Sequence, residues 1–75
     1  EQEIPKYLNV KMNESNGNFI FFQYLDDDYN QLASHLYKKG CIIKKIIKGN
    51  GKVFFRIAVR SLFDNQILIN AISDF

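Results

Sequence analysis

The sequence predicts a small α+β domain in which one sheet carries two helices packed on the same face. Four short segments have the period-two alternation or the β-branched composition of strands, and two longer segments repeat apolar residues at helical spacing. Their order is β-β-α-β-β-α. Because each helix has a single apolar face, one side of one sheet can cover both helices. At 75 residues, the chain is predicted to form one domain, residues 1–75.

The first two strands are predicted to form a hairpin. Residues 7–12 alternate between apolar and polar side chains, as a half-buried strand does. Residues 14–18 are rich in turn formers, and Asn16-Gly17 tolerates the positive φ angles of a tight turn. Residues 19–25 are apolar on both faces, which predicts a central strand covered on both sides.

The first helix is predicted to begin after three acids and to end at a glycine. The carboxylates of residues 26–28 can cap free backbone N–H groups and complement the positive end of the helix dipole. Gly40 suits the left-handed position after a helix. One apolar face is formed by Tyr29, Leu32, Ala33, Leu36 and Tyr37.

The second half of the chain predicts two strands and a closing helix. Residues 41–48 are β-branched, residues 49–51 form a tight turn, and residues 52–60 alternate. Ser61 has the form of a helix cap, with an acid three residues later. In strand 52–60, one face carries Phe55, Ile57 and Val59, and the other carries Phe54, Arg56, Ala58 and Arg60. The closing helix is expected to bury Leu68, Ala71, Ile72 and Phe75.

Composition excludes several classes of protein. One cysteine and one histidine cannot supply a zinc site of the usual Cys/His type or an internal disulfide. No apolar run reaches the roughly 18 residues of a transmembrane helix, and the opening residues lack the layout of a secretory signal. A reducing compartment is therefore expected, and the cytoplasm is the default localisation.

Three features have a functional and a structural interpretation. His35 can be a proton shuttle or a solvated helix residue, and Cys41 can be a reactive thiol or a small buried apolar side chain. The acids at 26–28 can bind Mg²⁺ or Ca²⁺ or simply begin a helix, and they lack the ligand spacing of a calcium loop. In each case the sequence favours the structural interpretation, so no metal site and no catalytic residue are predicted.

The distribution of charge is more informative than the net charge of +2. No Asp or Glu lies between Tyr29 and Phe63, whereas eight of the ten cations do. Arg56 is in the middle of a strand, where a fixed cation requires an anion or a carbonyl partner. These residues either form solvated edges or converge on an anion. The eight cations are Lys38, Lys39, Lys44, Lys45, Lys48, Lys52, Arg56 and Arg60.

About three quarters of the chain resembles the C-terminal small domain of fold-type I, pyridoxal-phosphate-dependent aminotransferases. The branch it most resembles is histidinol-phosphate aminotransferase, an enzyme of histidine biosynthesis. The family pattern is an Asn-aromatic strand, a helix, an apolar strand with a basic end, an arginine-bearing strand and a terminal helix. The matching segments are NFIFF (18–22), YNQLASHLYKKGCIIKK (29–45), FRIAVRS (55–61) and DNQILINAI (64–72).

The resemblance implies two substrate-binding residues. Arg56 falls on the arginine that pairs with the substrate α-carboxylate, and Lys44 falls where this branch often has an arginine that contacts the substrate phosphate. Lysine keeps the charge there but lacks the guanidinium fork. Arg60 replaces a usual glycine, Ala58 a Ser or Thr, and Ser61 a threonine. The change at Arg60 could mark another branch, such as a phosphothreonine decarboxylase-like enzyme.

The resemblance also implies that the chain is one part of a larger enzyme. The Schiff-base lysine, the acid against the pyridine nitrogen and the phosphate-cup residues belong to the family's large domain, which this chain lacks. The implied cofactor is pyridoxal phosphate, which the parent enzyme binds and this chain alone does not. The implied partners are that large domain and a small anionic amino-acid substrate, within a homodimeric parent enzyme.

A second interpretation is an independent α+β module that binds nucleic acid or another polyanion. It rests on the acid-free basic stretch and on four phenylalanines that lie on strands: Phe21, Phe22, Phe54 and Phe55. A third is a protein-interaction domain, since the sheet face without helices could be apolar.

Overall fold

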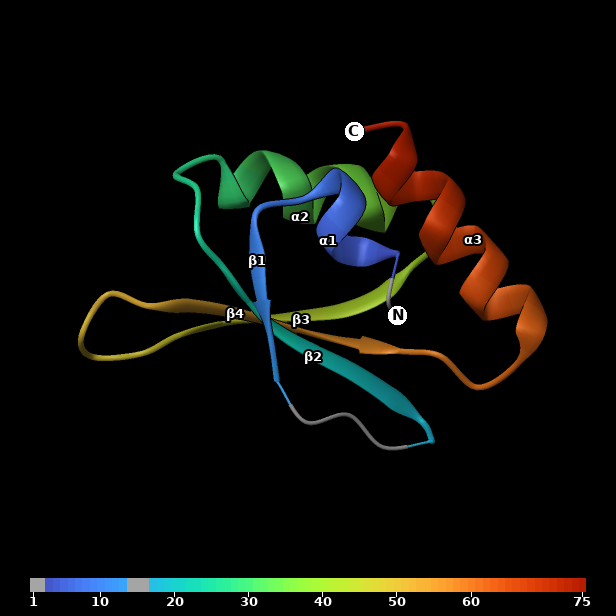
Figure 1. Ribbon diagram of the computed structural model, residues 1–75, viewed down its shortest axis with the longest axis horizontal. Helices are drawn as coiled ribbons and strands as arrows, with labels where there is room; N and C mark the ends of the chain where they lie inside the picture. Colours follow the sequence, from blue (N-terminus) through green and yellow to red (C-terminus); the bar gives the residue numbers. More distant parts are fainter. Residues whose placement is uncertain (1–2, 14–16) are drawn as a thin grey trace.

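The computed structural model describes residues 3–13 and 17–75, which form a four-stranded antiparallel sheet with its helices on one side (Figure 1). The strand order is β1-β2-β4-β3. This arrangement confirms the predicted α+β class and the packing of both long helices on one face. The elements are α1 (Ile4–Tyr7), β1 (Val10–Met12), β2 (Phe19–Tyr24), α2 (Tyr29–Lys38), β3 (Ile42–Ile47), β4 (Val53–Ala58) and α3 (Leu62–Ser73).

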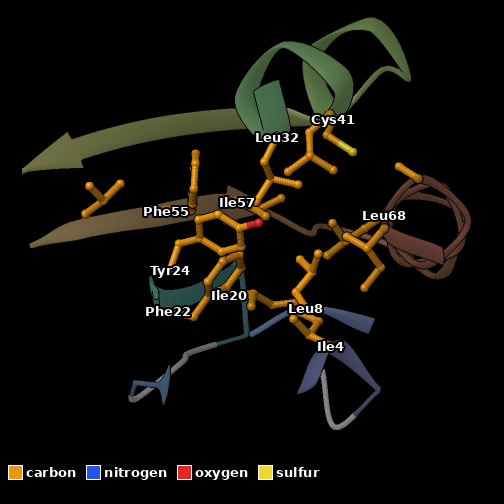
Figure 2. Close-up of a cluster of buried hydrophobic side chains, with 14 residues drawn as sticks. Ile4, Leu8, Ile20, Phe22, Tyr24, Leu32, Cys41, Phe55, Ile57 and Leu68 are labelled. Carbon is orange, nitrogen blue, oxygen red and sulfur yellow. The ribbon is translucent and has the colours of Figure 1, made fainter. Parts of the chain in front are cut away.

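The two central strands, β2 and β4, bury the side chains that face the helices. Phe22 and Phe55 are directly opposite in the register, and both are fully buried. Leu32 and Leu36 of α2 and Leu68 of α3 complete the layer above them. Figure 2 shows Phe55, Leu32 and Leu68 meeting between the sheet and the helices. The core therefore lies on one side of the sheet.

Among residues 3–13 and 17–75, no helix lies on the opposite side of the sheet, which corrects the prediction that residues 19–25 are covered on both sides. β2 buries every second residue, while Phe19, Phe21 and Gln23 are half-buried on the other face. A strand with apolar residues on both faces has the same pattern whether a second layer covers it or not. The sequence could place β2 in the centre of the sheet but could not show which face is covered.

The two long helices begin differently from one another. The hydroxyl of Ser61 accepts a hydrogen bond from the backbone N–H of Asp64 at 3.1 Å, which confirms the predicted cap of α3. Asp28 precedes α2 but makes no side-chain cap bond, so the prediction of a carboxylate cap is wrong. Its carboxylate instead accepts a hydrogen bond from the hydroxyl of Tyr24 at 2.6 Å, because Tyr24 ends β2 beside it.

The N-terminal segment contains a helix that the alternation did not predict. Tyr7 belongs to α1 and not to a strand, and β1 begins only at Val10. Pro5 suits the first turn of a helix, and Ile4 is fully buried against the core. At the other end, Phe75 lies beyond α3 and is 43% exposed, in contrast to its predicted burial.

The predicted turns are partly accounted for. Most of the turn at residues 14–18 lies outside the described residues. Gly40 has a φ of +95°, as predicted for the residue after α2, and Gly51 has a φ of +84° in the β3–β4 turn.

Candidate functional site

The sheet surface turned away from the helices, here called the open face, holds both predicted substrate-binding residues. Residues directly opposite in antiparallel strands share a face, so the register identifies its members. Figure 1 shows α1, α2 and α3 on the other side of the sheet. The open face is formed by Lys11, Phe19, Phe21, Gln23, Ile42, Lys44, Ile46, Phe54, Arg56 and Ala58. This set contains no acid.

Arg56 and Lys44 are direct cross-strand neighbours on β4 and β3. Phe21 of β2 is opposite Arg56 on the other side, so the three residues form one row across the sheet. Both cations are exposed. Like charges directly opposite in a sheet are destabilising, so an anion that binds to both side chains would relieve a repulsion already present in the fold.

The guanidinium of Arg56 leans toward β2. Its Cζ lies over the ring of Phe19 at 5.0 Å from the ring centroid, a cation–π contact. No carboxylate among residues 3–13 and 17–75 pairs with it. The ion pairs of this part of the chain are Lys39 with Asp74 and Arg60 with Asp64. Arg56 therefore retains a positive charge that no acid of the described chain neutralises.

Of the four phenylalanines that the sequence suggested for nucleic-acid binding, Phe21 and Phe54 lie on the open face. Phe21 and Phe54 stack with ring centroids 5.5 Å apart and an interplanar angle of 13°. The ammonium of Lys48 lies 5.9 Å from the centroid of Phe54. Phe22 and Phe55 are in the core instead. The half-buried pair Phe21 and Phe54 thus has cations near it. Arg56 and Lys44 are in the same row as Phe21, and Lys48 contacts Phe54.

Three of the cations in the acid-free stretch have ion-pair or hydrogen-bond partners inside the described chain. Arg60 pairs with Asp64 at 3.4 Å and Lys39 with Asp74 at 3.0 Å. The hydrogen bond and the charge of Lys39 lower the pKa of Asp74 below its ordinary value. The ammonium of Lys45 donates to the side-chain oxygen of Asn30 and lies over the ring of Tyr29, which ties β3 to α2.

His35 lies between α2 and α3, and its structural interpretation needs correction. It is half-buried rather than solvated. Its Nε2 lies 2.8 Å from the carbonyl oxygen of Ala71, and its ring lies 5.3 Å from that of Phe75. A carbonyl only accepts, so the proton of this bond is on Nε2. This arrangement links the two long helices and makes His35 a packing residue.

Cys41 and two of the three acids, Asp26 and Asp28, have structural roles in the described chain. Cys41 is 8% exposed, which confirms its interpretation as a small buried side chain, and burial raises the pKa of its thiol. Asp26 accepts a hydrogen bond from the side-chain nitrogen of Asn9 at 3.0 Å, and Asp28 accepts one from Tyr24. Within the described ranges, His, Cys, Asp and Glu form no cluster that could hold a metal ion.

Phe19 is the functional candidate that the sequence reasoning missed. Phe19 and Phe21 are two residues apart on β2 and so share the open face, and Arg56 is on the neighbouring strand. The alternation of side chains along a strand could have placed Phe19 on the same face as Phe21. The pairing of β2 with β4, which brings it to Arg56, is a long-range contact that no local pattern shows.

Comparison with known proteins identifies no relative: no family model, no curated protein and no solved structure matches the chain. Among the described helices, none has the length and apolar character needed to cross a lipid bilayer.

Proposed function

We propose that this chain is the substrate-anchoring C-terminal domain of a cytoplasmic, pyridoxal-phosphate-dependent aminotransferase similar to histidinol-phosphate aminotransferase. One observation carries the proposal: Arg56 and Lys44, the two residues that the resemblance implies, are cross-strand neighbours on a face that no helix covers. Both are exposed, and no acid of the described chain pairs with Arg56. A second domain could enclose a ligand against this face.

The two cations would recognise different anionic groups. The planar fork of Arg56 can donate two parallel N–H bonds to the α-carboxylate of an amino acid. Lys44 is a compact charge that can bind a phosphate or a second carboxylate. Since Arg56 leans toward β2 and Lys44 is on β3, the charges can engage two ends of one small molecule.

The chain does not fit the cofactor itself. The open face contains no acid that could face a pyridine nitrogen, and its two lysines, Lys11 and Lys44, are exposed. The pyridoxal phosphate and its lysine therefore belong to the large domain, where the cofactor supplies the electron sink for the reaction. This chain would bind and orient the substrate and help to close the site over it.

The test uses the complete protein in which these 75 residues occur, with Arg56→Ala compared with Arg60→Ala. Arg60 already pairs with Asp64 at the start of α3, so its loss controls for removal of an exposed positive charge. We expect Arg56→Ala to weaken amino-acid binding at least tenfold, or about 1.4 kcal/mol, with cofactor content unchanged. Amino-acid binding is measured from the change in the visible absorbance of the cofactor.

Lys44→Ala gives a second arm of this test. It should weaken binding of a phosphorylated amino alcohol more than binding of an amino acid without a phosphate. A complete protein that binds no pyridoxal phosphate, or an Arg56→Ala variant that binds amino acids as the wild type does, contradicts the proposal.

A second candidate function is the binding of single-stranded nucleic acid, which the stacked Phe21–Phe54 pair favours. Aromatic side chains on a sheet are platforms for bases, and the neighbouring cations match phosphate groups. The ammonium of Lys48 lies over the ring of Phe54, and Arg56 is directly opposite Phe21 in the register. This function requires the open face to be accessible, whereas the aminotransferase function requires another domain to enclose a ligand there.

A salt titration with a fluorescent single-stranded oligonucleotide separates the two candidates. A nucleic-acid module should bind at low ionic strength and lose affinity steeply as salt rises. Phe54→Leu should weaken this binding, while Phe63→Leu should not, because Phe63 is an exposed phenylalanine at the start of α3. An oligonucleotide that does not bind at low salt removes this candidate.

A further inference from the structure

We infer that Phe19 is a positioning residue that holds the guanidinium of Arg56 ready to bind a carboxylate. The inference rests on the proposed function, because it concerns how the same arginine meets its ligand. Its basis is the cation–π contact in which Cζ of Arg56 lies 5.0 Å from the centroid of the Phe19 ring.

The register explains how this contact arises. Ala58 is directly opposite Phe19, and Arg56 is two residues before Ala58 on the same face of β4. The contact with the Phe19 ring is therefore a diagonal one between neighbouring strands, and the small side chain of Ala58 offers little obstruction to it.

Lys44 gives the contact its direction. It is opposite Arg56 on the β3 side, so the two positive charges repel each other. Phe19 attracts the guanidinium on the β2 side through the negative face of its ring. Repulsion from one strand and attraction from the other act together, and both move the head group of Arg56 toward β2.

Contact with a ring face leaves the hydrogen-bonding capacity of the guanidinium available. The donors of a guanidinium lie in its plane, and a cation–π contact uses the charge and not an N–H bond. An arginine held in this way has lost part of its rotational freedom before the ligand arrives. Preorganisation of this kind raises affinity because less entropy is lost on binding.

The test compares Phe19→Leu, which removes the ring, with Phe19→Tyr, which keeps it, in the 75-residue chain. Phe63→Leu is the matched control, since it removes an exposed phenylalanine from the start of α3. The first readout is the ¹⁵N heteronuclear NOE of the Arg56 Nε–Hε group. The second is the affinity for succinate, measured by chemical-shift titration. Thermal midpoints show that each variant is folded.

We expect Phe19→Leu to lower the NOE of Arg56 and to weaken succinate binding about two- to fivefold. Phe19→Tyr and Phe63→Leu should behave as the wild type does. Wild-type NOE and affinity in Phe19→Leu would overturn the inference. So would a Phe19→Tyr variant as impaired as Phe19→Leu, since keeping the ring would then not preserve the position of Arg56.

The failure of the proposed function has a different signature. If Phe19→Leu releases Arg56 in the NOE while Arg56→Ala in the complete protein binds amino acids as the wild type does, Phe19 positions Arg56 but Arg56 is not a carboxylate site. That result supports the positioning role and counts against the proposed function.

Discussion

Tyr24 is a residue whose ionisation is coupled to folding. It is 5% exposed, and its hydroxyl donates to the carboxylate of Asp28 at 2.6 Å. Burial, the hydrogen bond and the nearby charges of Asp28 and Asp26 raise the pKa of Tyr24 above its ordinary value of 10.0. The native state therefore keeps the hydroxyl proton at a pH where the unfolded chain loses it.

This coupling predicts a difference between the wild type and Tyr24→Phe that depends on pH. Near neutral pH the variant should be less stable by about 1–2 kcal/mol, because it lacks the hydrogen bond to Asp28. Above about pH 10 the unfolded wild type loses the Tyr24 proton while the native state keeps it, which lowers the stability of the wild type but not of Tyr24→Phe. The difference in free energy of unfolding between the two proteins should therefore narrow. Urea unfolding from pH 7 to 11 measures both curves. Parallel curves above pH 10 would contradict the assignment.

The cap of α3 predicts a second effect of a single residue. Ser61→Ala removes the acceptor for the N–H of Asp64 and should lower the free energy of unfolding by about 1 kcal/mol. Ser73→Ala is the control at the other end of the same helix, where the hydroxyl donates to the carbonyl of Asn70. Differential scanning calorimetry should show a larger fall in Tm for Ser61→Ala than for Ser73→Ala.

The helices and strands were predicted correctly where the sequence pattern is compatible with only one type of secondary structure. The i, i+3, i+4 spacing of residues 29–37 gave α2, and the alternation of residues 52–60 placed Arg56 on the face opposite Phe55. The sequence could not show that one face of β2 is uncovered, because a strand with apolar residues on both faces has the same pattern whether one face or both are covered. α1 was missed because four residues are too short to show helical periodicity.

Neighbouring phenylalanines on β4 should respond very differently to truncation. Phe55 is fully buried beside Phe22 and Tyr24, and Phe55→Ala should cost about 3–5 kcal/mol. Phe54 is half-buried on the open face, so Phe54→Ala should cost much less. Chemical denaturation of the two variants gives the comparison. Equal losses would show that the open face is covered in solution.

The molecule as a whole has one core to which both ends of the chain contribute. Ile4 of α1 and Ile72 of α3 belong to the same buried cluster as the central strands. A domain of this size has a free energy of unfolding of roughly 4–11 kcal/mol. The candidate site lies outside this core, on the other side of the sheet. Substitutions there can therefore be read for binding with less effect on folding.

Ile4→Ala tests whether the N-terminal helix is part of this cooperative unit. Ile4 is fully buried, so the variant should lose about 2–5 kcal/mol and still unfold in a single transition. Circular dichroism and tyrosine fluorescence should report the same midpoint. Two separate midpoints, or a loss well below 1 kcal/mol, would show that α1 is not integrated into the core.

The site was predicted only in part, for a reason that belongs to the whole molecule. Arg56 stood out because a cation in the middle of a strand is unusual, and the resemblance added Lys44. Their adjacency follows from the β3–β4 hairpin around the predicted turn at residues 49–51, whereas the contact of Arg56 with Phe19 depends on β2 pairing with β4. Contacts between strands far apart in the sequence cannot be read from local periodicity.

The position of β3 at one end of the sheet has a consequence for aggregation. An exposed edge of sequence IIKKII is a template on which a second chain could add and begin a fibril. In a symmetric antiparallel pair with the best overlap, either Lys44 or Lys45 would be opposite its own copy, and the two ammonium groups would repel. Acetylation of both lysines would remove their positive charges and therefore this repulsion. The β3 edge would then pair more readily with a second chain.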